Sequence, residues 1–203
     1  MIIHMHPVDP QTRLVRQVAD ILRSGGIIIY PTDTLYGLGC DIHQHKAVER
    51  ICRIKGVEPQ KANLSFVCHD LSDLSRYASQ LSTPVYRTLK QYLPGPYTFI
   101  LTASREVPKI LKTKKDTVGI RVPDNRIARA IVEELGNPIL SATLPGDNVE
   151  EYTDPDTIHD RFGKLVDAVI DGGPGGIVPS TIVDFTSGEG VITRKGAGDW
   201  PEN

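Results

Sequence analysis

The run Ile27 to Tyr30 constrains the fold more than any other stretch of the chain. Its four residues, IIIY, are all apolar, and Pro31 follows them directly. Proline cannot donate a hydrogen bond to a neighbouring strand, so the run ends there. A short continuous apolar run is typical of a strand that is buried on both faces. The sheet that holds this strand therefore needs a layer of structure on each side.

Helix-like and strand-like segments follow one another irregularly along the rest of the chain. Asp9 and Pro10 predict the start of a first helix, which Gly25 and Gly26 end. Further helices are predicted at 46–55, 71–78, 83–93, 125–135 and from 155 onward. Further strands are predicted at 63–68, 97–104, 117–123, 138–144 and 166–170, with a closing hairpin of 179–185 and 191–196. This order predicts an α/β fold with a twisted mixed, largely buried sheet flanked by helices.

Length and composition narrow the classes of protein that the chain can represent. With 203 residues, a net charge of −2 and no internal repeat or linker, it is expected to form one soluble domain. A nucleotide or RNA site must therefore come from a local basic patch. The three cysteines form no C-x-x-C pair, which fits a reducing compartment. No signal peptide or membrane-spanning run is visible, so we expect a cytoplasmic protein without membrane contact.

Several common motifs are absent, and others are weak. The chain has no P-loop, no G-x-G-x-x-G fingerprint and no G-x-S-x-G elbow. The segment GGPGG (172–176) is more typical of a plain loop than of a phosphate cradle. The pairs His4/His6 and His43/His45 lack the further ligands that a metal site needs, so we expect no metal site. The lysine-rich segment 109–115 fits a solvated loop better than a lid over a site.

Polar side chains inside the strand patterns are harder to explain by packing. Arg121 interrupts TVGIRVP, and an arginine there is unfavourable unless it meets a carboxylate or a phosphate. Ser141 and Thr143 share one strand face, while Ser180 begins a strand and Arg194 ends one. Thr32 and Thr34 follow the first buried strand. Each is a common strand-end residue by itself, but together they favour one pocket for a small anionic ligand.

The motifs that carry these residues resemble those of a known family. YPTDTLYGLGCD resembles the P-T-[ED]-T-x-Y-G-L-G signature of the YrdC/YciO family. AVERICRIKG, TVGIRVPDN, LSATLPG, PSTIVDF and VITRKGAG then follow in the order of that family. The resemblance implies a single YrdC-like domain over residues 1–203, with a concave open cleft and without the C-terminal extension domain of some relatives. In this fold Gly37 and Gly39 would let the chain turn sharply and approach a ligand closely.

The resemblance also implies a reaction. Members of the family act as L-threonylcarbamoyladenylate synthases, which are nucleotidyltransferases. They make threonylcarbamoyl-AMP and pyrophosphate from L-threonine, bicarbonate and ATP, and the product supplies the t6A modification of tRNA. ATP would bring Mg²⁺ as a substrate complex, so no permanently bound cofactor is expected. Such a site has to align two anions and stabilise the charge that develops on the phosphates.

Site residues follow from matching positions of the motifs. The threonine-binding residues implied by the resemblance are Thr34, Arg121, Ser141 and Ser180. The nucleotide-binding residues are Lys55, Lys61, Asn63, Thr117, Thr143 and Arg194. Lys55 and Arg121 are the residues expected to be catalytic, because their charges would face the reacting groups.

The chain departs from the family pattern on the nucleotide side. Val57 stands where a K-x-R motif has its arginine, Cys68 where a histidine is found, and Thr143 where an S-x-N motif has its asparagine. The inserted segment EPQKAN offers Lys61 as a replacement charge. These departures resemble the YciO branch, and they leave open whether the synthase reaction is the one carried out.

Two other classes of function stay open. The first is a non-catalytic double-stranded RNA-binding or ribosome-associated module, whose footprint could include the lysine-rich segment 109–115 together with Arg50, Arg53 and Lys55. The net negative charge argues against strong RNA binding. The second is a carbamoyl- or nucleotide-handling enzyme with a different acceptor. RNA and other proteins of the t6A pathway are further candidate partners.

Overall fold

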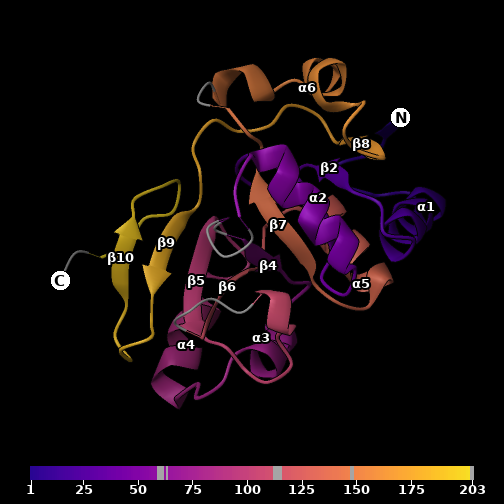
Figure 1. Ribbon diagram of the computed structural model, residues 1–203. Coiled ribbons are helices and arrows are strands. Elements are labelled where there is room, and N and C mark those ends of the chain that lie inside the picture. Colours follow the sequence, from indigo (N-terminus) through magenta and orange to yellow (C-terminus); the bar gives the residue numbers. More distant parts are fainter. Residues whose placement is uncertain (59–61, 63, 112–115, 147–148, 202–203) are drawn as a thin grey trace.

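The chain folds around one mixed sheet, as expected from the sequence (Figure 1). The computed structural model describes residues 1–58, 62, 64–111, 116–146 and 149–201. The strands are β1 (Ile2–His4), β2 (Ile28–Tyr30), β3 (Gly37–Asp41), β4 (Ser65–Val67), β5 (Tyr97–Thr102), β6 (Thr117–Arg121), β7 (Ile139–Thr143), β8 (Ala168–Asp171), β9 (Thr181–Asp184) and β10 (Val191–Arg194). Their order in the sheet is β1-β8-β2-β3-β7-β4-β6-β5-β9-β10.

Parallel and antiparallel pairs are mixed across this sheet. Strand β2 runs parallel to β8 and antiparallel to β3. Strand β4 is antiparallel to β7 and parallel to β6. The predicted closing hairpin is confirmed, because β9 and β10 pair antiparallel. Strands β1 and β3 were not predicted from the sequence.

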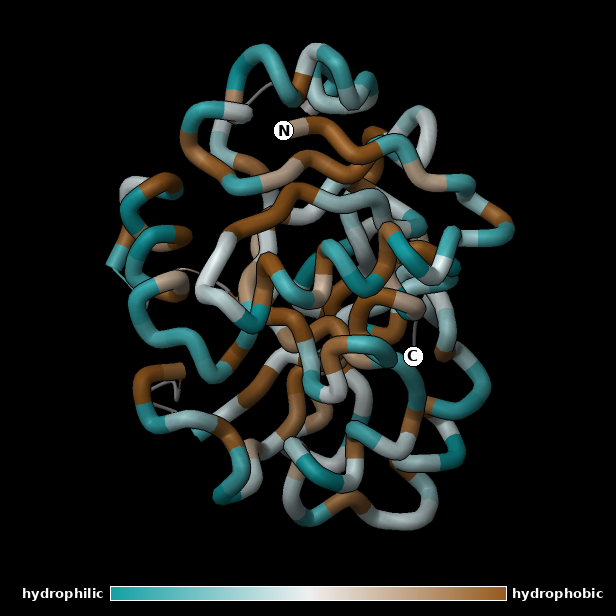
Figure 2. The backbone as a smooth tube through the Cα atoms, turned by 90° about the vertical axis from the view of Figure 1, so that its right-hand side faces the viewer, coloured by the Kyte–Doolittle hydropathy of each residue, from teal (hydrophilic) through white to brown (hydrophobic). Residues whose placement is uncertain are grey.

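Helices cover both faces of the sheet. They are α1 (Thr12–Arg23), α2 (His45–Lys55), α3 (Ser72–Tyr77), α4 (Thr83–Tyr92), α5 (Arg126–Leu135) and α6 (Pro155–Phe162), with 3₁₀ turns η2 (Lys109–Leu111) and η3 (Val149–Tyr152). Helices α1 and α5 pack on one face with β1, β2 and β8. The larger apolar cluster lies on the opposite face and includes residues of α2, α3, α4 and α6. Figure 2 shows the corresponding hydrophobic stretches in the interior of the backbone trace.

Most helix ends lie where the sequence predicted them. Gly56 and Gly136 follow α2 and α5 with φ of +66° and +82°, a conformation that glycine adopts readily. The side chain of Asp154 accepts a hydrogen bond from the Thr157 backbone N–H at the start of α6. The predicted cap of α1 was wrong. The helix begins at Thr12, with Gln11 and not Asp9 at the N-cap position.

One face of the central strands carries unusually small residues. The strand register places Gly39, Ser141, Ser65 and Gly119 side by side on β3, β7, β4 and β6. Gly39 pairs with Ile28 of β2, so the two residues lie on the same face of the sheet. At β2 this face is covered by α1 and α5, because Ile28 packs against them. Over β7, β4 and β6, which lie farther along the sheet, the small side chains leave an open space. These strands form the floor of a cavity.

The expectation that Gly37 and Gly39 make a sharp turn was wrong. Both lie inside β3, and neither has a positive φ. Their lack of a side chain serves packing instead. A Cβ at Gly39 would lie 2.9 Å from the Tyr30 ring, and one at Gly37 would lie 3.0 Å from Ser141 Oγ. The glycines therefore make room for the ring of Tyr30 across β3.

Two negative findings concern only the part of the chain that the structure describes. No helix there is long and apolar enough to cross a membrane. No group of three or more His, Cys, Asp or Glu side chains there could hold a metal ion.

Candidate functional site

A cavity of about 670 Å³ opens above the small residues of the central strands. Of the ten residues that the sequence predicted for the site, eight line it: Thr34, Lys55, Thr117, Arg121, Ser141, Thr143, Ser180 and Arg194. The other two, Lys61 and Asn63, lie outside the described residues. The eight residues come from α2, β6, β7, β10 and the segments before β3 and β9. Residues far apart in the sequence thus meet at one place.

Arg121, the last residue of β6, is held by the signature segment. Its Nη2 donates to Asp33 Oδ1 at 2.5 Å, to Thr34 Oγ1 at 2.6 Å and to Thr32 Oγ1 at 3.1 Å. Both side chains of the ion pair are nearly buried, with 11% of Arg121 and 10% of Asp33 exposed. Asp33 Oδ2 also accepts from the backbone N–H of Asp124. The carboxylate that a buried arginine needs is thus supplied by the chain itself.

Arg194, the last residue of β10, lies at the same end of the cavity. Its Nε and Nη2 donate to the Ser180 carbonyl at 3.1 and 2.8 Å, and Nη2 also donates to Ser180 Oγ at 3.1 Å. Ser180 Oγ lies 2.9 Å from Thr98 Oγ1. Burial, and then the neighbouring Arg121, lower the pKa of Arg194. Two guanidinium groups therefore lie close together, and Asp33 neutralises the charge of Arg121.

Lys55 lies at the other end of the cavity. Its Nζ donates to the Thr143 carbonyl at 2.7 Å and to Thr143 Oγ1 at 3.3 Å. Partial burial lowers the pKa of Lys55. Thr143 ends β7, and Thr117 begins β6 at this side of the sheet. Four residue steps of a strand separate Thr117 from Arg121, which is about 13 Å at about 3.3 Å per residue.

Apolar side chains line the cavity near Lys55. They include Val57, Leu64 and Leu111. Val57 is 37% exposed, so its side chain reaches the surface where the family pattern has an arginine. Cys68, the other departure, is fully buried and does not line the cavity. Burial raises the pKa of the Cys68 thiol well above its usual value, so the thiol stays neutral inside the core.

Three contributors to the site were missed by the sequence analysis. Tyr30 donates to Ser141 Oγ from inside the core, Asp33 neutralises Arg121, and Thr98 contacts Ser180. Asp33 carried a signal, because it stands between two threonines of the signature next to a buried strand. Thr98 and Tyr30 looked like ordinary strand residues.

The glycine-rich loop 172–176 is not arranged as a phosphate cradle. The backbone N–H groups of Gly175 and Gly176 donate to the carbonyls of Thr153 and Thr34, each at 2.7 Å. A Cβ at Gly176 would lie 2.6 Å from the Thr34 carbonyl oxygen. The loop therefore packs against the signature segment and fixes the position of Thr34.

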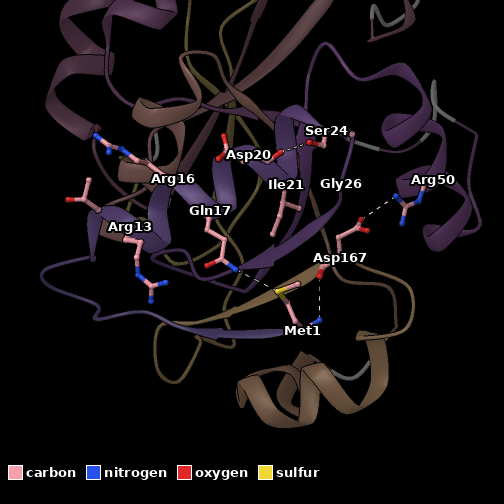
Figure 3. A pocket seen from close by; sticks show the side chains of 12 residues that line it. Met1, Arg13, Arg16, Gln17, Asp20, Ile21, Ser24, Gly26, Arg50 and Asp167 are labelled. Atoms are coloured by element: carbon pink, nitrogen blue, oxygen red, sulfur yellow. Dashed lines mark hydrogen bonds and ion pairs between the residues drawn. The ribbon is translucent and has the colours of Figure 1, made fainter.

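A larger cavity, of about 930 Å³, lies beside α1 (Figure 3). Arg50 pairs there with Asp167 at 3.2 Å, and the Met1 amino group donates to the Asp167 carbonyl. None of the eight described site residues lines it. Half of its lining residues belong to α1, and most of these are exposed, whereas the sheet cavity holds buried hydroxyl and guanidinium groups. Chemistry rather than size makes the sheet cavity the candidate site.

Comparison with known proteins gives one consistent result. The Sua5/YciO/YrdC family model, described as telomere recombination, matches residues 20–196. The uncharacterized protein YciO of Escherichia coli K12 is 46% identical over 199 residues, 97% of this chain and 95% of that protein. The threonylcarbamoyl-AMP synthase of Halorhodospira halophila is 33% identical over 193 residues, 91% of this chain and 97% of that protein.

Solved structures agree with the sequence comparison. The crystal structure of E. coli YciO superposes with a TM-score of 0.90 at 45% identity, over 98% of this chain and 97% of that chain. Pyrococcus abyssi Sua5 complexed with L-threonine gives 0.85 at 29% identity, over 97% of this chain and 57% of that chain. The family predicted from the sequence motifs is thereby confirmed: the chain belongs to the Sua5/YciO/YrdC family.

Proposed function

We propose that the protein is an L-threonylcarbamoyladenylate synthase, or a diverged relative with the same type of chemistry. It would convert L-threonine, bicarbonate and ATP into threonylcarbamoyl-AMP, pyrophosphate and water, for the t6A modification of tRNA. The observation that carries this proposal is the meeting of two guanidinium groups, several buried hydroxyls and the Asp33 carboxylate at one end of a cavity. Two cations beside one carboxylate favour an added anion.

The arginine end would bind the amino acid. Arg121 and the hydroxyls of Thr34, Ser141 and Ser180 would hold the threonine carboxylate, and Arg194 would supply the second positive charge. The P. abyssi Sua5 structure is a complex with L-threonine, which supports threonine as the amino acid here. Because Asp33 already fixes the Arg121 side chain, little conformational freedom would be lost on binding.

The lysine end would bind ATP. Lys55, Thr117 and Thr143 line it, and Lys61 and Asn63 are proposed for the same side from the family resemblance. Threonine and bicarbonate would form a carbamate, one oxygen of which attacks the α-phosphorus while pyrophosphate leaves with the electron pair of the broken bond. Mg²⁺ would enter with ATP and be held by its phosphates and water. The protein would align the reactants and stabilise charge.

The RNA-binding alternative receives less support. Of the lysine-rich segment proposed for its footprint, Lys109 is exposed, and Lys112, Lys114 and Lys115 lie outside the described residues. Two of the three cations proposed on α2 already have partners inside the protein, because Arg50 pairs with Asp167 and Lys55 donates to Thr143. Arg53, the third, is exposed on α2. Phosphate binding by Arg50 would have to break its ion pair with Asp167 first. Lys55 lines the sheet cavity, where we propose that it meets ATP.

Pyrophosphate release tests the proposed function. With ATP, Mg²⁺, L-threonine and bicarbonate, we expect release that stops when either threonine or bicarbonate is left out. Val57 replaces a family cation, so the rate is expected to be low, and the assay must run long enough to detect slow turnover. Release that does not depend on threonine would contradict the proposal. Salt-sensitive RNA binding without any turnover would favour the alternative.

A further inference from the structure

Tyr30 lies beneath the candidate site and reaches it across a neighbouring strand. It is the last residue of β2 and is fully buried. Strand β3 lies between β2 and β7. The Tyr30 ring extends over the two glycines of β3, since a Cβ at Gly37 or Gly39 would come within 3.1 or 2.9 Å of the ring. At the far side of β3, Tyr30 Oη meets Ser141 Oγ on β7 at 2.8 Å.

The direction of this hydrogen bond fixes what Ser141 can do. Tyr30 Oη is the donor and Ser141 Oγ the acceptor. Burial raises the pKa of Tyr30 to about 12, so the phenol keeps its proton at neutral pH. A serine hydroxyl has one proton and two lone pairs. With its oxygen engaged by Tyr30 from below, Ser141 has its own proton left for the cavity that it lines.

Two other hydroxyls in the cavity are engaged in the same way. Thr34 Oγ1 accepts from Arg121 Nη2, and Ser180 Oγ accepts from Arg194 Nη2. In each case an arginine N–H occupies a lone pair of the hydroxyl oxygen. Thr34 Oγ1 also lies 3.3 Å from Thr32 Oγ1, and Ser180 Oγ lies 2.9 Å from Thr98 Oγ1, with either atom of each pair able to donate. A hydroxyl whose proton is left for the cavity, as at Ser141, suits a ligand group that only accepts hydrogen bonds, such as a carboxylate or phosphate oxygen. Ser141 differs from Thr34 and Ser180 because the donor to its oxygen is a neutral phenol and not a guanidinium cation.

We propose that Tyr30 is a positioning residue that fixes Ser141 as a hydrogen-bond donor to an oxyanion of the substrate. Gly37 and Gly39 provide the space that the Tyr30 ring needs to reach Ser141. Tyr30, the two glycines and Ser141 thus act as one unit spanning three adjacent strands. The identity of the oxyanion as the threonine carboxylate rests on the proposed function, whereas the direction of the Ser141 hydroxyl does not.

A purely structural role for Ser141 predicts a different outcome. If Ser141 only satisfies the buried phenol, removing the phenol oxygen affects stability and leaves substrate binding alone. If Tyr30 acts through Ser141, its removal weakens binding, and the loss disappears once Ser141 is gone. The two roles therefore separate in a double-mutant cycle.

The kinetic arm uses Tyr30→Phe, Ser141→Ala and the double variant. Phenylalanine keeps the ring that packs on β3 and removes only the hydroxyl. We expect Tyr30→Phe to lower kcat/KM for L-threonine by about tenfold, in the range of one lost hydrogen bond to a charged group, and to act mainly through KM. In the Ser141→Ala background the same change should have no further effect. An equal loss in both backgrounds, or no loss in either, would overturn the proposal.

Tyr77→Phe is the matched control. Tyr77 Oη is also buried, has no hydrogen-bond partner among the described residues and does not line the cavity. Removing the Tyr77 hydroxyl tests whether the loss of any buried tyrosine hydroxyl changes KM for threonine. We expect an unchanged KM for threonine. A tenfold change in this variant too would show that the effect of Tyr30→Phe is not specific, and would count against the proposal.

Neutron diffraction from crystals of the perdeuterated protein tests the hydroxyl direction without any substrate. We expect one deuteron on the line from Tyr30 Oη to Ser141 Oγ, and the Ser141 deuteron directed into the cavity. A Ser141 deuteron that points at Tyr30 would overturn the proposal. If the wild-type protein fails to turn over threonine, the proposed function fails, and this map still decides whether Tyr30 sets the direction of Ser141.

Discussion

The two ends of the cavity are built in different ways. At the Arg121 end most polar groups are held by other parts of the chain, through Asp33, Ser180 and Thr98, while the buried Arg121 Nε has no hydrogen-bond partner among the described residues. At the Lys55 end one ammonium group contacts one exposed threonine among apolar side chains such as Val57. Preorganised groups bind a ligand with less loss of entropy. The comparison indicates that the fold fixes the proposed amino-acid end, whereas the proposed nucleotide end holds residues that depart from the family motifs matched in the sequence.

The departures from the family pattern support this contrast. Val57 and Thr143, which replace an arginine and an asparagine, both line the Lys55 end. Arg121, Thr34 and Ser180, which match the family motifs in the sequence prediction, line the cavity at the other end.

The largest effect is expected from Arg121→Ala. Removing one partner of a buried ion pair leaves Asp33 uncompensated and costs about 3–5 kcal/mol of stability. Threonine affinity should fall by roughly a hundredfold or more, because the guanidinium contact is lost. Chemical denaturation and titration calorimetry measure the two effects.

A second variant separates stability from binding at the same position. Arg121→Met combined with Asp33→Asn removes both charges and keeps an acceptor for the Asp124 N–H. We expect most of the stability to return while threonine still fails to bind. Unchanged threonine affinity in either variant would show that the arginine end does not hold the amino acid.

The next largest effect is expected from Arg194→Met. Its guanidinium is only partly buried, so the fold should tolerate the change better than the loss of Arg121. Pyrophosphate release should fall by ~10²–10³, as for other losses of a charge-stabilising group. Arg194→Lys keeps a charge and should restore part of the rate. Full activity in Arg194→Met would mean that the second guanidinium takes no part in the reaction.

A gain is expected at the opposite end from Val57→Arg. The side chain of Val57 is already partly exposed at the cavity, so an arginine can enter without burial. A further cation near the phosphates should raise turnover by about tenfold and lower KM for ATP more than KM for threonine. Val57→Met supplies bulk without charge and serves as the control. If turnover stays level or drops, the nucleotide end does not work as proposed.

The smallest effect is expected in the pH dependence of stability. Burial lowers the folded-state pKa of Lys55 below its ordinary value of 10.5. At a pH between the lowered folded-state pKa and the unfolded-state pKa of 10.5, Lys55 binds more protons in the unfolded chain than in the folded one. The contribution of Lys55 to the free energy of unfolding therefore rises as the pH increases through this range. Below the folded pKa the group is charged in both states, and the burial penalty is fully present.

The comparison with Lys55→Met isolates this effect from the tyrosines, which titrate in a similar range. The wild-type protein should gain stability relative to the variant as pH is raised towards and beyond 10.5, as measured by denaturation at each pH. A stability difference that stays flat, or that moves in the opposite direction, would show that burial does not depress the Lys55 pKa.

The sequence predicted the class of fold and the place of the site because strands and strand-end polar residues follow local patterns. Ile27 to Tyr30 required a sheet covered on both faces, and Arg121 required a carboxylate or phosphate. The identity of that carboxylate could not be read from the pattern, because Asp33 and Arg121 meet only when β6 lies beside the signature segment.

Side chains that act across strands were also missed. The pairing of β3 with β7 joins residues that are far apart in the sequence. The glycines of β3 were interpreted as turn residues because glycine has no side chain that favours a strand. Once β3 is known to separate Tyr30 from Ser141, the glycines are explained by the ring that passes over them. The short edge strand β1 escaped prediction since its three residues carry little pattern.

The central claim is that both ends of the cavity contribute to one product. Mass spectrometry of a reaction with ATP, Mg²⁺, L-threonine and ¹³C-bicarbonate detects that product. We expect threonylcarbamoyl-adenylate that carries the labelled carbon, abolished by Arg121→Met with Asp33→Asn and increased by Val57→Arg. An adenylate without the label, or no threonine-containing adenylate from either the wild-type protein or Val57→Arg, would contradict the claim.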